Sequence, residues 1–178
     1  MKRLVALIGL IFAPPVLQGA LSPFLPAALR PDLSLLVVFG VALGWRNPAT
    51  GLALVAAGGF VVDLLSGGLL GQRALLGVLI FGGARMLSLR VGLLGPFPKM
   101  LFAGLLTVAH AVGLAALTSF FAPGSGGELL RLAPLLLQAV VNAFAAPILI
   151  PAVQGLVGWL GGDESARRGT RLALRSYA

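Results

Sequence analysis

Apolar segments alternate with short polar or glycine- and proline-rich breaks along this chain. Six such segments can be distinguished, at Leu4–Leu21, Leu33–Trp45, Gly51–Leu65, Ala74–Leu87, Pro98–Phe121 and Leu132–Leu160. A helix needs about 20 apolar residues to cross the hydrocarbon of a bilayer. The pattern therefore predicts an all-α integral membrane protein, a compact bundle of about six transmembrane helices. Several of the segments are short for a complete crossing.

The composition supports a membrane location. Of the 178 residues, 58% are hydrophobic and only 10% are charged, whereas a soluble domain carries about 25% charged residues. The net charge of +8 would suggest nucleic-acid binding in a soluble protein. Here the basic residues flank apolar segments, as they do on the cytoplasmic side of membrane proteins. We therefore expect contacts with membrane lipids and no nucleic-acid partner.

The basic residues also predict an orientation. With six spans, both termini lie on the same side of the membrane. If that side is the cytoplasm, only Arg30, Arg73 and Arg131 of the 13 basic residues lie outside, as the positive-inside rule requires. Residues 1–162 then form a single transmembrane domain, and 163–178 form a short basic cytoplasmic tail. A signal peptide is a weaker interpretation of the first segment, because further spans follow it.

Few polar groups are available for chemistry inside the segments. The chain has no Cys and one His, so neither thiolate chemistry nor a clustered metal site is expected. Catalysis needs an acid, a base, a nucleophile or a metal to converge, and Asp63 is the only acidic residue inside an apolar segment. The sequence therefore predicts no enzymatic activity and no cofactor.

Asp63 is a costly residue in an apolar helix, because a carboxylate there must be paired, hydrogen-bonded or neutralised. Ser66 and Gly67 follow it closely, and Arg73 opens the next segment. In one interpretation Asp63 accepts hydrogen bonds from the turn or pairs with Arg73, and so holds a helical hairpin. In the other it binds a proton, an ion or a substrate. The first is favoured because no relay of titratable groups accompanies it, and it predicts an Asp63–Arg73 contact.

The remaining polar residues of the spans are interpreted as contacts between helices. His110 is expected to form a hydrogen bond between helices, as polar side chains commonly do in bundles. Gln138 and Asn142 are four residues apart and share one helix face, where they hydrogen-bond a neighbouring helix or line a ligand site. Close helix approach is expected at six glycines: Gly58, Gly59, Gly82, Gly83, Gly104 and Gly113.

Three motifs resemble those of the rod shape-determining protein MreD family. They are Arg30-Pro31-Asp32-Leu33, the run from Gly59 through Asp63 to Gly67 with Gly71 and Arg73 after it, and Val141-Asn142 followed by Pro147. Val55-Ala56 stand where that family often has Gly-Phe, a departure that weakens the case for close packing at this point. It does indicate a set of structural or functional residues, namely Pro31, Asp32, Gly59, Asp63, Gly67, Gly71, Arg73, Asn142 and Pro147.

The resemblance implies a scaffold in the bacterial cytoplasmic membrane that takes part in cell elongation and has no catalytic activity. Its direct partner would be MreC, and through MreC it would join MreB, RodA and the penicillin-binding protein of RodA. A second copy of the chain is a further potential partner. The implied fold is similar to the substrate-binding subunits of energy-coupling-factor transporters.

That fold similarity leaves one alternative open, a solute-binding subunit of a vitamin-type transporter. This alternative requires an outward-facing cavity on which Gln138, Asn142, His110 and Asp63 converge. A filled interior would instead favour the scaffold.

Overall fold

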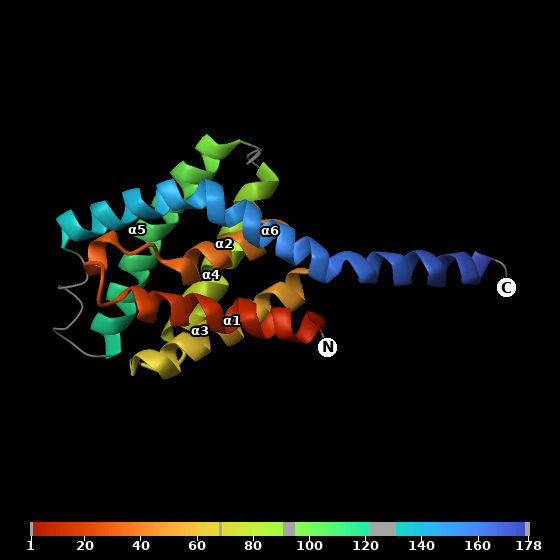
Figure 1. Ribbon diagram of the computed structural model, residues 1–178, viewed down its shortest axis with the longest axis horizontal. Helices are drawn as coiled ribbons and strands as arrows, with labels where there is room; N and C mark the ends of the chain where they lie inside the picture. Colours follow the sequence, from red (N-terminus) through yellow and green to blue (C-terminus); the bar gives the residue numbers. More distant parts are fainter. Residues whose placement is uncertain (1, 68, 91–94, 122–130, 177–178) are drawn as a thin grey trace.

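In the computed structural model, the described residues 2–67, 69–90, 95–121 and 131–176 form helices joined by short connections. The elements are α1 (Lys2–Leu21), the 3-10 helix η1 (Ala27–Leu29), α2 (Leu33–Gly44), α3 (Pro48–Ser66), α4 (Gln72–Arg90), α5 (Pro96–Phe121) and α6 (Leu132–Ser176). Each predicted apolar segment coincides with one α-helix, so the all-helical prediction is confirmed. The start of α1 and the final part of α6 lie at the same end of the bundle (Figure 1).

Three of the helices are long and apolar enough to cross a membrane: α3, α5 and the Leu132–Leu160 part of α6. The apolar stretches of α1 and α2, at Val5–Leu21 and Leu33–Gly44, are shorter. Helix α4 carries three arginines among its 19 residues. Within the described residues, the chain is therefore helical with three candidate membrane spans. The helix α6 also continues to Ser176, beyond the predicted boundary of the tail at residue 163.

The short helix α2 lies at the centre of the bundle, in contact with α1, α3, α4, α5 and α6. Apart from Ser34 it is apolar, and its residues Leu36 and Phe39 are each 1% exposed. At about 1.5 Å per residue, its 12 residues extend only about 18 Å. A Cβ atom on Gly40 would lie 2.6 Å from Val153, so α2 and α6 approach each other closely at this glycine.

Large apolar side chains cover much of the outer surface of the bundle. Leu79 in α4 is 61% exposed, and Ile148 in α6 is 75% exposed. Soluble monomers rarely expose large continuous apolar areas. Such an outer face suits contact with lipid chains or with the apolar helices of other proteins.

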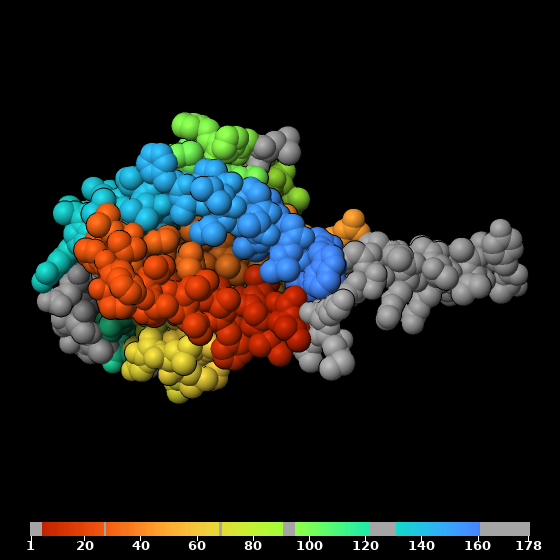
Figure 2. All heavy atoms as spheres, in the orientation of Figure 1, coloured from red at the N-terminus to blue at the C-terminus, as the bar shows by residue number. Residues whose placement is uncertain are grey.

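Helix α1 packs on α2 and α3, and Figure 2 shows it on the visible face of the molecule between α6 and α3. Pro14 and Pro15 lie inside this helix. A proline has no N–H group, so the carbonyls of Leu10 and Ile11, one turn earlier, lose their usual helical partners. Helix α1 is thus locally weakened where it faces the interior of the bundle.

Candidate functional site

The hairpin between α3 and α4 is held by Asp63. The Arg73 N–H donates to both carboxylate oxygens of Asp63, at 3.2 Å to Oδ1 and 3.0 Å to Oδ2. The Nη1 atom of Arg73 lies 3.5 Å from Oδ1 and also donates to the Ser66 hydroxyl. Asp63 is 1% exposed, so its burial is compensated by a backbone amide and a cation. The predicted Asp63–Arg73 contact is confirmed.

Glycines shape the same hairpin. Gly67 ends α3 with φ 64° and Gly71 precedes α4 with φ 87°, a left-handed backbone that glycine adopts without steric cost. A Cβ atom on Gly59 would lie 2.5 Å from the Cα of Ala74. The backbones of α3 and α4 therefore touch at Gly59, one turn before Asp63.

A second polar cluster joins α2, α5 and α6. Asp32 caps α2, because its Oδ1 accepts from the Leu35 N–H at 3.0 Å. The Asp32 N–H in turn donates to the side-chain oxygen of Asn142, at 2.7 Å. The amide nitrogen of Asn142 donates to the Thr107 hydroxyl at 2.9 Å, which donates to the Ala103 carbonyl. Asn142 is fully buried, and the predicted hydrogen bonding between helices is confirmed for this residue.

Helix α1 joins this cluster through Gln18. Its amide nitrogen donates to the Pro31 carbonyl at 3.3 Å and to Asp32 Oδ1 at 3.2 Å. Its oxygen accepts from the Ser34 hydroxyl at 3.3 Å. His110 of α5 places Nδ1 3.9 Å from Asp32 Oδ2. This is beyond hydrogen-bond distance, so the predicted hydrogen bond of His110 between helices is not formed with this carboxylate.

The opposite end of α2 is capped by an arginine from α4. Arg85 donates to the carbonyls of Ala42 at 3.2 Å, Trp45 at 2.6 Å and Arg46 at 3.1 Å. The last carbonyls of a helix lack partners and carry partial negative charge. Charged side chains therefore cap both ends of α2.

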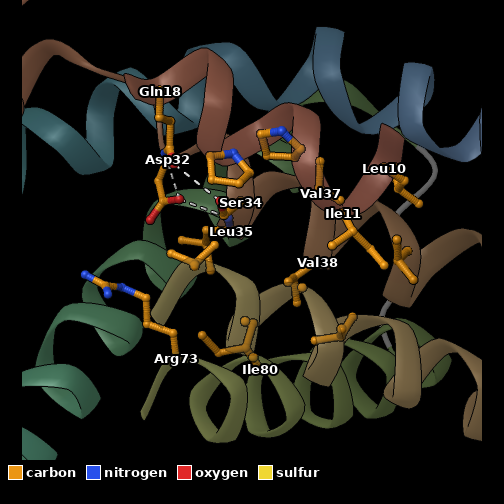
Figure 3. Close-up of a pocket in the computed structure, with 18 of the residues that line it drawn as sticks. Leu10, Ile11, Gln18, Asp32, Ser34, Leu35, Val37, Val38, Arg73 and Ile80 are labelled. Atoms are coloured by element: carbon orange, nitrogen blue, oxygen red, sulfur yellow. Dashed lines mark hydrogen bonds between the residues drawn. The ribbon is translucent and has the colours of Figure 1, made fainter. Parts of the chain in front are cut away.

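A cavity of about 390 Å³ lies between α1, α2, α3 and α4, with one residue from α5. Its polar lining residues gather at one end, as the labelled side chains in Figure 3 show. The lining residues are Leu10, Ile11, Pro14, Pro15, Gln18, Asp32, Ser34, Leu35, Val37, Val38, Val41, Leu54, Val55, Gly58, Gly59, Val62, Leu65, Ser66, Arg73, Gly77, Ile80 and His110. The interior is thus not completely filled.

The cavity brings together a different set of residues from the one that the sequence suggested. Of the four residues expected to converge, only His110 lines it. Asp63 and Asn142 are buried behind its walls, where they hold Arg73 and Asp32 in place. Gln138 on α6 is not among the lining residues. Pro147 is half-buried within α6.

Close approach of helices was predicted correctly for some glycines and incorrectly for others. A Cβ atom would be crowded at Gly59, and at Gly113 it would lie 2.6 Å from Leu76. At Gly104 it would make only ordinary contact, at 3.6 Å from the Ala139 carbonyl. The prediction is wrong for Gly58, Gly82 and Gly83, where no atom lies within 4 Å of the added Cβ. The crowded glycines that it missed are Gly40, Gly44, Gly51 and Gly77.

Arg85 and Gln72 make polar contacts that were not foreseen. Arg85 was expected only as a basic residue on the cytoplasmic side, although it reaches inward to the end of α2. Gln72 of α4 donates to the Thr118 hydroxyl of α5 at 2.7 Å. A glutamine at the start of an apolar helix was the available signal for the second contact, but the sequence does not identify its partner.

Comparison of the chain with protein-family models, with curated proteins and with solved structures finds no match. Among the described residues, no three His, Asp or Glu side chains lie together as a metal site would require. The arrangement places an acidic residue, Asp32, and a basic residue, Arg73, in the lining of a largely apolar cavity. It can therefore bind charged groups of either sign.

Proposed function

We propose that this protein is a non-catalytic membrane scaffold of the bacterial cell-elongation machinery, similar to MreD. In this role it binds MreC within the cytoplasmic membrane and so supports lateral peptidoglycan synthesis and rod cell shape. Through MreC it is linked to MreB, RodA and the penicillin-binding protein of RodA. The proposal rests on the three sequence motifs and on where their residues lie in the fold.

The observation that carries the proposal is the structural use of the motif residues. Asp32 of the first motif and Asn142 of the third are 110 positions apart and hydrogen-bonded at 2.7 Å. Asp63 and Arg73 of the second motif pair with each other. These residues hold α2, α3, α4 and α6 in register, which is the role that polar side chains serve in a rigid helical scaffold.

The proposed topology has six crossings with both termini in the cytoplasm. The start of α1 and the final part of α6 lie at one end of the bundle, which supports it, as does the predicted excess of basic residues on that side. The short apolar stretches of α1 and α2 complete their crossings with the help of polar flanking turns and longer neighbours. Arg30, Arg73 and the end of α3 then lie toward the outer surface.

Co-purification with MreC tests the scaffold. The tagged full-length chain is co-expressed with MreC from the same genome and isolated in mild detergent, with an unrelated six-span protein as the control bait. We expect MreC to be retained by this chain and not by the control. We also expect a variant truncated after Gly162 to retain it, because the spans provide the contact.

Absence of MreC above the control level, while the bait elutes as a single monodisperse species, would overturn the proposal. A cell-shape assay gives an independent measurement. Expression of the chain in rod-shaped cells depleted of their own MreD is expected to reduce cell width to normal. Cells that stay round, with the chain present in the membrane, would count equally against it.

A second candidate function is binding of a small solute, and the cavity favours it. A volume of about 390 Å³ falls within the range of small-molecule sites, roughly 300–1,000 Å³. A solute-binding subunit would retain a vitamin-sized, water-soluble compound through purification. Mass spectrometry of the denatured protein tests this, and the scaffold proposal expects no such compound.

A further inference from the structure

The cavity separates polar from apolar groups along its length. Its polar residues gather at one end: Gln18, Asp32 and Arg73 lie on the same side of the cavity in Figure 3, whereas Leu10, Ile11 and Val38 lie toward the other side. Ser34, Ser66 and His110 add further hydrogen-bonding groups to the lining. A ligand that satisfies both ends must itself be amphipathic.

The polar end lies next to the mouth of the cavity. Leu65 is 64% exposed and Ser66 is also exposed, although both line the cavity. The buried residues Val41, Val55 and Ile80 form its deeper walls. A ligand would thus place its polar group near the C-terminal end of α3 and its apolar part farther inside.

The polar end of the cavity contains both a basic side chain, Arg73, and an acidic one, Asp32. Arg73 is 32% exposed and uses Nη1 for its contacts with Asp63 and Ser66, while the rest of the guanidinium fork can bind an anionic oxygen. The hydrogen bonds of Asp32 use Oδ1, and its Oδ2 lies 3.9 Å from His110 Nδ1. A ligand that carries a phosphate and an ammonium group matches Arg73 and Asp32 respectively.

Three glycines contribute to the lining of the cavity. Gly58, Gly59 and Gly77 line it, and a Cβ atom on Gly58 would have no neighbour within 4 Å. A larger side chain at Gly58 therefore enters empty space rather than a packed interface. This position allows the cavity to be filled with little disturbance of the bundle.

We propose that this cavity binds a zwitterionic membrane lipid of the phosphatidylethanolamine type. The phosphate lies near Arg73, the ammonium near Asp32, and the first part of one acyl chain lies along the apolar walls. A volume of about 390 Å³ holds this part of the lipid, while the rest of the molecule stays in the bilayer. The inference does not depend on the scaffold function.

Lipid retention measured by native mass spectrometry tests the proposal. The purified full-length chain is equilibrated with vesicles that contain equal amounts of phosphatidylethanolamine and phosphatidylglycerol with identical acyl chains. We expect phosphatidylethanolamine to be preferred about tenfold, the effect of one additional charge-assisted hydrogen bond. Equal retention of the two lipids would indicate nonspecific surface lipid and would overturn the proposal.

Two variants test the site itself. Gly58→Leu is expected to abolish retention, whereas the matched control Gly82→Leu, also in open space but outside the cavity, is expected to keep it. Asp32→Asn keeps an N-cap oxygen for α2 but removes the negative charge. The ratio of retained phosphatidylethanolamine to phosphatidylglycerol is therefore expected to fall to about one. If Gly58→Leu is not monodisperse, Val38→Phe serves as the filling variant. Retention equal to the control in a folded filling variant would place the lipid elsewhere.

A competition experiment separates a lipid from a soluble ligand. Glycerophosphoethanolamine carries the same headgroup chemistry without acyl chains. We expect it not to displace the lipid at equal concentration, because it leaves the apolar walls without a partner. Displacement at equal concentration would show that the headgroup is sufficient, which contradicts the lipid proposal and favours a site for a water-soluble compound.

Discussion

Gly58 and Gly59 are neighbours in α3 but face different surroundings, so alanine at each position tests how α3 packs on α4. A Cβ atom at Gly59 would lie 2.5 Å from the Cα and 2.6 Å from the N of Ala74. At Gly58 no atom lies within 4 Å. Both substitutions gain the same helix propensity, about 1 kcal/mol. The difference in stability between the two variants therefore measures the contact between the helices.

The expected magnitude follows from these distances. Ordinary contact begins at 3.4 Å, so a Cβ placed 2.5 Å from Ala74 requires the helices to separate by about 0.9 Å (3.4 minus 2.5). The opposing atoms belong to the backbone, so a side-chain rotation cannot relieve the clash. Overpacking of this kind costs about 1–3 kcal/mol. The same movement would stretch the 3.0 Å bond from Arg73 N to Asp63 Oδ2, and loss of that bond would cost about 1–3 kcal/mol more.

After the propensity gain is subtracted, Gly59→Ala is expected to lower the free energy of unfolding by about 1–5 kcal/mol. Gly58→Ala is expected to raise it by up to about 1 kcal/mol. Unfolding by sodium dodecyl sulfate in mixed micelles, followed by circular dichroism, measures both variants. Thermal melting offers a second readout, at roughly 2–4 °C per kcal/mol for a chain of this size. The reasoning is refuted if Gly59→Ala is as stable as Gly58→Ala.

Three further substitutions test the other polar contacts. Asp63→Leu is expected to be less stable than Asp63→Asn by about 1–3 kcal/mol, because Asn still offers an oxygen to the Arg73 N–H; equal melting temperatures would argue against this role. Arg85→Met is expected to lower the free energy of unfolding by about 1.5–3 kcal/mol and to speed deuterium uptake at the C-terminal end of α2. Arg85→Lys is expected to restore only part of this stability, because lysine lacks the planar guanidinium fork. Asn142→Leu is expected to cost about 1–3 kcal/mol because it leaves the Asp32 N–H unsatisfied. Unchanged uptake at the start of α2 in this last variant would contradict the hydrogen bond as its cause.

The sequence by itself determined where the helices lie, because apolar runs and helix-breaking residues act locally. It also contained the capping signals that refine the boundaries. Helix α3 begins at Pro48 rather than at Gly51 because Asn47 accepts from the Ala49 N–H and proline suits the first turn. The Asp63–Arg73 contact was predictable for the same reason, since ten residues and a glycine turn separate the partners.

Only the tertiary structure decided which helix faces meet. In α2 nearly every position is apolar, so the sequence does not distinguish a face that contacts α6 from one that lines a cavity. The glycines show the same limit, because Gly58 borders open space and Gly59 touches a backbone. Partners such as Asp32 and Asn142 lie 110 residues apart, and their contact depends on the order in which the helices pack. The hydrophobic periodicity of a sequence indicates the local preference for helix and the average polarity of each segment. The cavity and its charged end instead arise from the packing of five separate helices.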